Sequence, residues 1–145
     1  LMFADARYYF VDYLTERERT SPEVPLNVLH RYLIDLQDRI SAPSLSIACL
    51  GLNADYCRGS NVKFLAPDLI ARADVVTDLS AAADVPPANG RPQFVIVNAS
   101  LGELARSVQQ RYPTLTPVQL AGPQGDVYFL VYEIAPPDGL GTARP

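Results

Sequence analysis

Hydrophobic residues recur along the chain with two different periods, which predict a mixture of helices and strands. Between Val28 and Ile40 the apolar positions fall at steps of three and four, which is typical of one face of an amphipathic helix that ends near Pro43. Two short continuous apolar runs, at 45–51 and 94–97, are instead typical of strands buried on both faces. The pattern therefore predicts a core built from one long helix and two central strands.

Weaker patterns predict the remaining elements. The aromatic run at 8–13 predicts a first strand, and 74–79 predicts a weak strand near a sheet edge. Residues 53–61 and 81–92 are polar or rich in Pro and Gly, so we expect loops there, and 62–69 favours a short helix broken at Pro67.

Two helix starts carry the spacing of a capping box. Thr20 with Glu23, and Ser100 with Glu103, each place a hydroxyl three residues before a carboxylate. The second box precedes an apolar stripe that runs to Tyr112 before Pro113, so we expect a helix capped by Ser100.

The end of the chain predicts an antiparallel hairpin. Alternating residues at 118–120 and a long apolar run at 127–134 flank a turn sequence rich in Gly at 122–126. Together with the alternation of strands and helices, this predicts an α/β fold: a three-layer, mainly parallel, Rossmann/flavodoxin-like sheet with helices on both faces and a C-terminal antiparallel hairpin. We expect a single domain over residues 1–135 and a flexible Pro/Gly-rich tail over 136–145.

Composition and charge narrow the classes of protein. Of the 145 residues 48% are hydrophobic, which is enough for one sizeable core. The net charge is −4, and a nucleic-acid-binding domain would instead need clustered Lys and Arg, so we expect no nucleic-acid partner. No apolar run approaches the ~20 residues that span a bilayer, so the chain as given is expected to be soluble.

The sequence offers no complete catalytic site. Its one histidine, His30, lies beside Arg31 off the apolar stripe, where a solvated side chain is expected. A Ser or Cys nucleophile needs a base, and a zinc site built from several histidines is excluded by a single His. Neither a G-x-G-x-x-G fingerprint nor a phosphate-binding loop is present. We therefore expect no catalytic residue, no metal and no cofactor in this chain.

The two cysteines leave two interpretations open. Cys49 and Cys57 lack the C-x-x-C spacing of a metal knuckle. Cys49 is either a small buried hydrophobe with Cys57 an incidental loop residue, or the two form a disulfide. A disulfide would imply an oxidising compartment.

Polar residues that follow the two central strands are candidates for a ligand site. Asn53, Tyr56 and Arg58 follow the first strand, and Asn98 follows the second. Ligands of open α/β sheets bind at the carboxyl ends of strands, so these four residues are candidates for binding a small polar ligand. The alternative is an ordinary hydrogen-bonded loop.

Four segments together resemble a known family. They are YYFVDY at 8–13, KFLAP at 63–67, the helix sequence at 102–113 and DVYFLVYE at 126–133. In this order they resemble the soluble C-terminal domain of bacterial polytopic glycosyltransferases, which are similar to the dolichyl-phosphate-mannose–protein mannosyltransferases of the glycosyltransferase-C superfamily. The resemblance covers residues 8–134 and departs from the family at 53–60, where the family is more aromatic.

The resemblance implies a parent enzyme with many membrane helices and a lipid-phosphate-linked sugar donor. It places the catalytic acidic residues in the membrane portion and its first external loop, outside this chain. The leading hypothesis is a non-catalytic accessory domain on the non-cytoplasmic face of the bacterial cell membrane. Its partner would be the membrane-embedded portion of the same polypeptide, and its candidate ligand a glycan or a lipid-linked sugar. The alternatives are a free-standing α/β module that binds a small polar ligand, and a protein-interaction domain.

Overall fold

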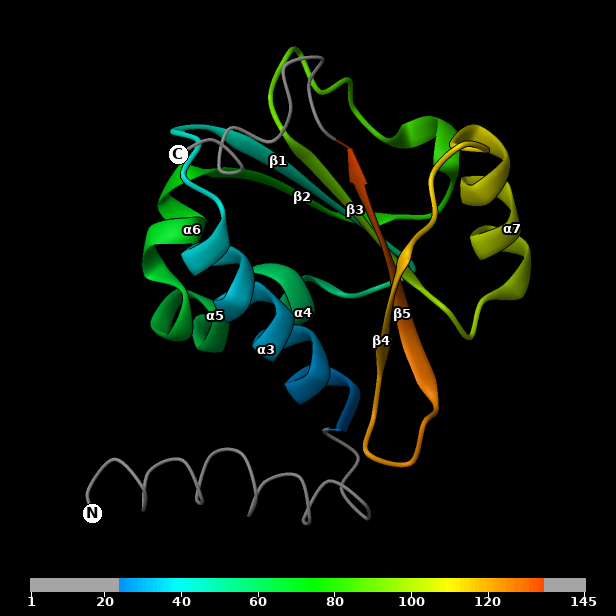
Figure 1. Cartoon of the computed structure of the whole chain (residues 1–145), viewed down its shortest axis with the longest axis horizontal. Coiled ribbons are helices and arrows are strands. Elements are labelled where there is room, and N and C mark those ends of the chain that lie inside the picture. The colour runs from blue at the N-terminus through cyan, green and yellow to red at the C-terminus, as the bar shows by residue number, and fades with distance from the viewer. Residues whose placement is uncertain (1–23, 135–145) are drawn as a thin grey trace.

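A computed structural model describes residues 24–134 of the chain. The strand predicted at 8–13, the capping box from Thr20 to Glu23 and the tail predicted at 136–145 lie outside the described residues. The elements, in chain order, are α3 (Val24–Arg39), β1 (Leu45–Leu50), α4 (Ala54–Arg58), α5 (Ser60–Leu65), α6 (Pro67–Arg72), β2 (Ala73–Leu79), the 3₁₀ turn η2 (Ala82–Asp84), β3 (Gln93–Asn98), α7 (Gly102–Arg111), β4 (Val118–Ala121) and β5 (Val127–Ile134) (Figure 1).

The strands form one mixed sheet in the order β2-β1-β3-β5-β4. β1 pairs in parallel with β2 and β3, whereas β5 pairs antiparallel with both β3 and β4. The fold is therefore α/β, but the expected three-layer, mainly parallel, Rossmann/flavodoxin-like sheet is wrong. After α7 the chain forms the outermost strand β4 and returns through a tight turn, so β5 enters between β4 and β3 without a helical crossover and runs antiparallel to both.

The two faces of the sheet carry unequal helical cover. Figure 1 shows α3 to α6 on one side of the sheet and α7 on the other. Along β1, Ile47 and Cys49 pack toward α3 to α6, whereas Ala48 and Leu50 pack toward η2 and α7. All six residues of β1 are buried, which confirms the strand that the continuous apolar run predicted and explains why it lacks alternation.

Arg72 at the end of α6 stabilises the C-terminal end of α3. Its Nη1 donates to the carbonyl oxygens of Ile40 and Ala42, each at 2.7 Å. Carbonyls at the end of a helix have no partner within the helix, so this contact satisfies groups that would otherwise be left unpaired. From α3, the Oε1 atom of Gln37 accepts a hydrogen bond from the backbone N–H of Leu69 in α6 at 2.9 Å.

Between residues 53 and 79 the structure confirms two of the predicted features and contradicts a third. The helix break at Pro67 is confirmed because α5 ends at Leu65 and α6 begins at Pro67, and the edge position of 74–79 is confirmed by β2. The loop predicted at 53–61 is wrong, since α4 and the first two residues of α5 lie there. Neither short helix is long enough to show a clear period in the sequence.

The capping box predicted at Ser100 is also wrong. α7 begins after Leu101, with no side chain capping it, and the Ser100 hydroxyl instead donates to Oδ1 of Asn98 at 2.7 Å. Asn98 draws Ser100 toward the end of β3, away from the capping position. Within residues 24–134 no helix has both the length and the apolar character needed to cross a membrane.

Candidate functional site

A crevice opens where the chain leaves two neighbouring parallel strands in opposite directions. From β1 the chain continues into α4, which packs on the α3 side of the sheet, and from β3 it continues into α7 on the other side. In open α/β sheets the carboxyl ends of two such strands enclose the usual ligand crevice. Two hollows lie at this point.

The first, which we call the aromatic hollow, has a volume of about 330 Å³, within the range of small-molecule sites. It lies on the α4 side and brings together the end of β1, α4, the end of β3 and the start of β5. Its lining residues are Pro25, Gly51, Leu52, Asn53, Tyr56, Asn98, Ser100, Val127, Tyr128 and Phe129.

The second, which we call the serine hollow, lies on the α7 side and has a volume of about 640 Å³. It adjoins the aromatic hollow, because Gly51 and Ser100 line both. Its lining residues are Gly51, Ser80, Ala81, Ser100, Leu101, Gly102, Glu103, Leu104 and Ser107.

Gly51 lies where the two hollows meet. Its φ is +71°, and a Cβ at this position would lie 2.6 Å from Cδ1 of Leu101. Both the backbone conformation and the close approach of Leu101 therefore require glycine here.

Asn98 holds the crevice together from the end of β3. Its Nδ2 donates to the carbonyl oxygen of Gly51 at 3.2 Å, and its Oδ1 accepts from both the N–H and the hydroxyl of Ser100, at 3.0 and 2.7 Å. The side-chain amide of Asn98 thus links the end of β3 to the residue after β1 and to the segment that precedes α7. Ser100 lines both hollows, and its hydroxyl oxygen can still accept a hydrogen bond.

Two tyrosines give the aromatic hollow its character. The Tyr56 ring meets Phe129 edge to face, with centroids 5.8 Å apart and an interplanar angle of 68°. Tyr128 lies over Gly122, where a Cβ would stand 2.6 Å from its ring. Both tyrosines are half-buried, so part of each ring remains accessible.

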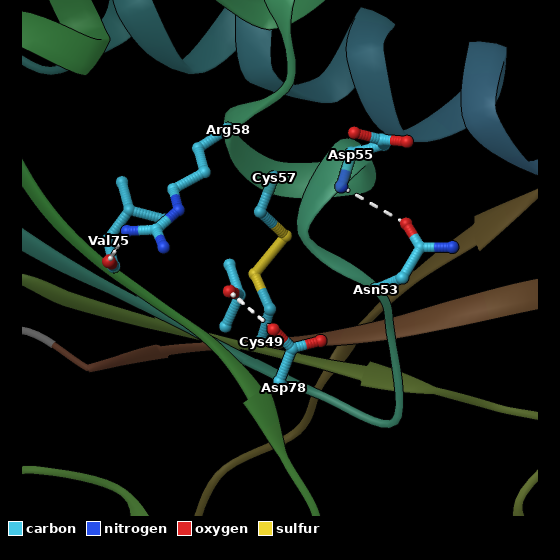
Figure 2. The surroundings of a disulfide bond; sticks show 8 residues. Cys49, Asn53, Asp55, Cys57, Arg58, Val75 and Asp78 are labelled. Carbon is cyan, nitrogen blue, oxygen red and sulfur yellow. Dashed lines mark hydrogen bonds between the residues drawn. A yellow bond between two sulfur atoms is a disulfide. The ribbon is translucent and has the colours of Figure 1, made fainter.

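The structure brings three of the four predicted ligand residues together. Asn53, Tyr56 and Asn98 line the aromatic hollow, and Asn53 also accepts a hydrogen bond from the N–H of Asp55 at the start of α4. Arg58 is the exception: its side chain extends away from Asn53 and donates to the carbonyl oxygen of Val75 on the edge strand β2 at 3.5 Å (Figure 2). Arg58 is therefore not among the residues that line either hollow.

Sequence reasoning missed the residues that other elements contribute. Tyr128 and Phe129 come from β5, and Ser80, Ser100 and Ser107 come from both sides of the crevice. Only the insertion of β5 beside β3 places Tyr128 near Tyr56. The period of the β5 sequence indicates a strand but not its neighbour.

A disulfide joins Cys49 of β1 to Cys57 of α4 (Figure 2). The two Cα atoms are 6.9 Å apart, and both residues are fully buried. Of the two interpretations that the sequence left open, the structure has the disulfide. The bond anchors α4, and with it Asn53 and Tyr56, to the central strand.

His30 is buried rather than solvated, so that expectation is wrong. Only 6% of the residue is exposed, and its Nε2 has no hydrogen-bond partner among the described residues. Burial lowers the pKa of His30, and hydrogen bonding to the backbone of Tyr56 and Asp55 opposes the shift. The cover comes from α4, the helix that the sequence did not predict.

The crevice is lined by polar and apolar groups and is nearly free of charge. Glu103 is its one charged lining residue, and neither hollow is lined by Lys or Arg from the described part of the chain. Residues 24–134 hold no group of three or more His, Cys, Asp or Glu side chains that could bind a metal. The hydroxyl, amide and tyrosine groups of the lining suit hydrogen bonding and ring stacking.

No family model, curated protein or solved structure matches this chain.

Proposed function

We propose that this chain is a non-catalytic accessory domain of a bacterial polytopic glycosyltransferase that uses a lipid-phosphate-linked sugar donor. The domain would stand on the non-cytoplasmic face of the cell membrane, beside the membrane-embedded portion of the same polypeptide. The observation that carries the proposal is the buried Cys49–Cys57 disulfide. Disulfides persist in oxidising compartments and are rare in the cytoplasm.

The chemistry of the crevice supports a non-catalytic role. Ser100 donates its hydroxyl proton to the amide of Asn98, and no His lines either hollow. Glu103 lacks a second carboxylate there, and glycosidic chemistry requires a pair. Transfer of a sugar would then be performed by residues elsewhere in the parent enzyme.

An exposed apolar pair supports packing against another part of the polypeptide. Phe64 on α5 is 82% exposed and its neighbour Leu65 is 41% exposed. Exposed adjacent hydrophobic residues of this size are common at interaction surfaces. Both lie in the KFLAP segment, one of the four that resemble the glycosyltransferase family.

The first test is the coding sequence upstream of Leu1. We expect several apolar segments of ~20 residues, each long enough to span a bilayer. A start codon at or just before Leu1 with no such segment would contradict the proposal.

The second test separates an accessory role from a catalytic one. Removing residues 24–134 from the parent enzyme should leave its membrane insertion intact and reduce transfer to the natural acceptor. Hydrolysis or transfer of the lipid-linked sugar by the present chain alone would show that the domain is itself catalytic. When the domain and the membrane portion are expressed as separate chains, Phe64→Ser should weaken their co-purification, whereas Ser60→Ala on the same helix should not.

The second candidate function is a free-standing module that binds a small polar ligand. The two adjoining hollows at the strand ends favour it, because they form a crevice at the usual ligand position of α/β sheets. The upstream sequence distinguishes this candidate from the first.

A further inference from the structure

We propose that the crevice binds a neutral oligosaccharide that runs from the aromatic hollow, past Gly51, into the serine hollow. This inference deepens the proposed function: in a glycosyltransferase the ligand would be the glycan acceptor rather than the phosphate-bearing sugar donor. Each part of the crevice supplies a different element of the recognition.

The aromatic hollow suits a sugar ring. Tyr56 and Tyr128 approach it from α4 and β5, two elements held at fixed positions by the disulfide and by the pairing of β5 with β3. Tyrosine offers an apolar ring body with a polar hydroxyl at its tip, which matches the apolar faces and polar rim of a pyranose. The Nδ2 atom of Asn53 is an additional donor, because only its Oδ1 is used in capping α4.

The serine hollow suits the hydroxyl groups of the next sugar units. Ser80, Ser100 and Ser107 line it from the loop after β2, the approach to α7, and α7 itself. Each hydroxyl oxygen can accept a hydrogen bond, and the carboxylate of Glu103 accepts from O–H donors. This lining holds acceptors for several sugar hydroxyls within one open surface.

The charge of the crevice selects against a phosphate. No Lys or Arg among residues 24–134 lines either hollow, and Glu103 would repel an anion. Phosphate sites normally pair the oxygens with Arg or Lys. A neutral sugar therefore fits the lining better than the headgroup of a sugar phosphate.

Continuity of the two hollows sets the length of the ligand. They share Gly51 and Ser100, so the two hollows meet at these residues. A single hexose would occupy one hollow, whereas two or three linked units would reach both. Affinity should thus rise with length up to the point where both hollows are filled.

The test is a titration of the isotope-labelled chain followed by amide NMR. The probes are mannose, glucose and galactose, their linear di- and trisaccharides, and mannose 1-phosphate. We expect one trisaccharide series to bind at least about 10-fold more tightly than its monosaccharide. The shifted amides should include Gly51, Tyr56, Ser100 and Tyr128. Mannose 1-phosphate should bind no better than mannose.

Two variants locate the ligand, and a third controls for them. Ser80→Arg should obstruct the serine hollow, so that the trisaccharide falls to the affinity of the monosaccharide while the monosaccharide is unaffected. Tyr128→Ala should weaken both about 10-fold through loss of ring contact. Ser60→Arg makes the same substitution on α5, away from the crevice, and should change neither affinity. If Tyr128→Ala fails to fold, the comparison of Ser80→Arg with Ser60→Arg still shows whether the trisaccharide occupies the serine hollow.

Several outcomes would overturn the inference. They are no shift with any neutral sugar up to about 20 mM, shifts with mannose 1-phosphate alone, shifts that map outside the crevice, or the same loss in Ser80→Arg and Ser60→Arg. Failure here leaves the glycosyltransferase proposal standing if membrane segments lie upstream of Leu1. Binding without such segments would instead assign the crevice to a free-standing sugar-binding module.

Discussion

His30 occupies an unfavourable position for a titratable group. The ring is buried under α4 and its Nε2 is unpaired among the described residues, so burial lowers its pKa in the folded chain. In the unfolded chain the pKa returns to about 6.5. Below that pH the unfolded state binds a proton that the folded state does not, so stability is lost as the pH falls from about 6.5 toward the folded pKa.

The free energy of unfolding should therefore decrease as the pH falls from about 7.5 to about 5.5. His30→Gln should remove most of this dependence, because His30 is the chain's single histidine. Urea unfolding at several pH values gives the free energy of unfolding of the wild-type chain and of His30→Gln. If the free energy of unfolding depends on pH equally in the two proteins, burial of His30 is not the cause of that dependence.

A part-buried contact joins α3 to β5. The Tyr32 hydroxyl donates to Oε2 of Glu133 at 2.5 Å, and Nη2 of Arg39 donates to the same oxygen at 2.9 Å. Burial raises the pKa of Tyr32, and the neighbouring Glu133 carboxylate raises it further. Arg39 also pairs with Asp35 at 3.2 Å, but Asp35 is largely exposed.

Tyr32→Phe should lower the free energy of unfolding by about 1 kcal/mol, since it removes a part-buried hydrogen bond to a charged acceptor. Asp35→Asn, at the exposed end of the same group, should cost less than about 0.5 kcal/mol. A double-mutant cycle of Tyr32→Phe with Glu133→Ala should give a coupling of about 0.5–1 kcal/mol. A coupling of zero would mean that the contact contributes nothing to stability.

Among the elements, α4 depends most on a single covalent bond. It has five residues, too few for a stable isolated helix, and the disulfide from Cys57 holds it on β1. Since α4 covers His30 and supplies Tyr56, the disulfide positions one wall of the crevice. The two sulfur-bearing residues are fully buried, so a reductant reaches them only after local or global unfolding.

Replacing both Cys49 and Cys57 by Ala should lower the free energy of unfolding by about 2–3 kcal/mol on the loop-entropy estimate. The loss should be accompanied by large amide shifts in α4 and small ones in α7, which lies on the other face of the sheet. Denaturant unfolding and amide NMR provide the two measurements. Equal shifts in α4 and α7 would contradict the local role given to the bond.

For the whole molecule, Gly51 is a point at which the hollows on the two sides of the sheet meet. Its φ of +71° and the 2.6 Å approach of Leu101 add two separate costs to any side chain there. Gly90 is a matched control, because its φ is +80° and a Cβ would meet nothing within 4 Å.

Gly90→Ala should cost about 1 kcal/mol, from backbone strain alone. Gly51→Ala should cost at least about 1 kcal/mol more, because Leu101 must move as well. Thermal or urea unfolding of the two variants gives the difference directly. Equal losses would show that Leu101 moves aside without cost.

Much of the fold was accessible to sequence reasoning at the level of single elements. The buried strands at β1 and β3, the long helix α3 and the break at Pro67 follow from the period of apolar residues and from proline geometry. The mixed order of the sheet was not accessible, because apolar period indicates that 127–134 is a strand but carries no information about its neighbours. Helix α4 was missed since its stability comes from the disulfide and tertiary packing.

The residues of the candidate site likewise fall into those that the sequence predicted and those that only the tertiary structure brings in. Asn53, Tyr56 and Asn98 were identified from their position after central strands, which is a local feature of the sequence. Tyr128 joins them only through the pairing of β5 with β3, and Arg58 leaves them because the edge carbonyl of Val75 lies within its reach.

By itself, the sequence determined the α/β class, the buried character of the central strands and the absence of clustered cationic residues. These depend on residue type and on spacing within one element. Only the tertiary structure decided the strand order, the burial of His30, the Cys49–Cys57 bond and the crevice shared by Gly51 and Ser100. Each of these joins residues that are distant in the sequence or covers them with another element, and such contacts are set by packing rather than by local period.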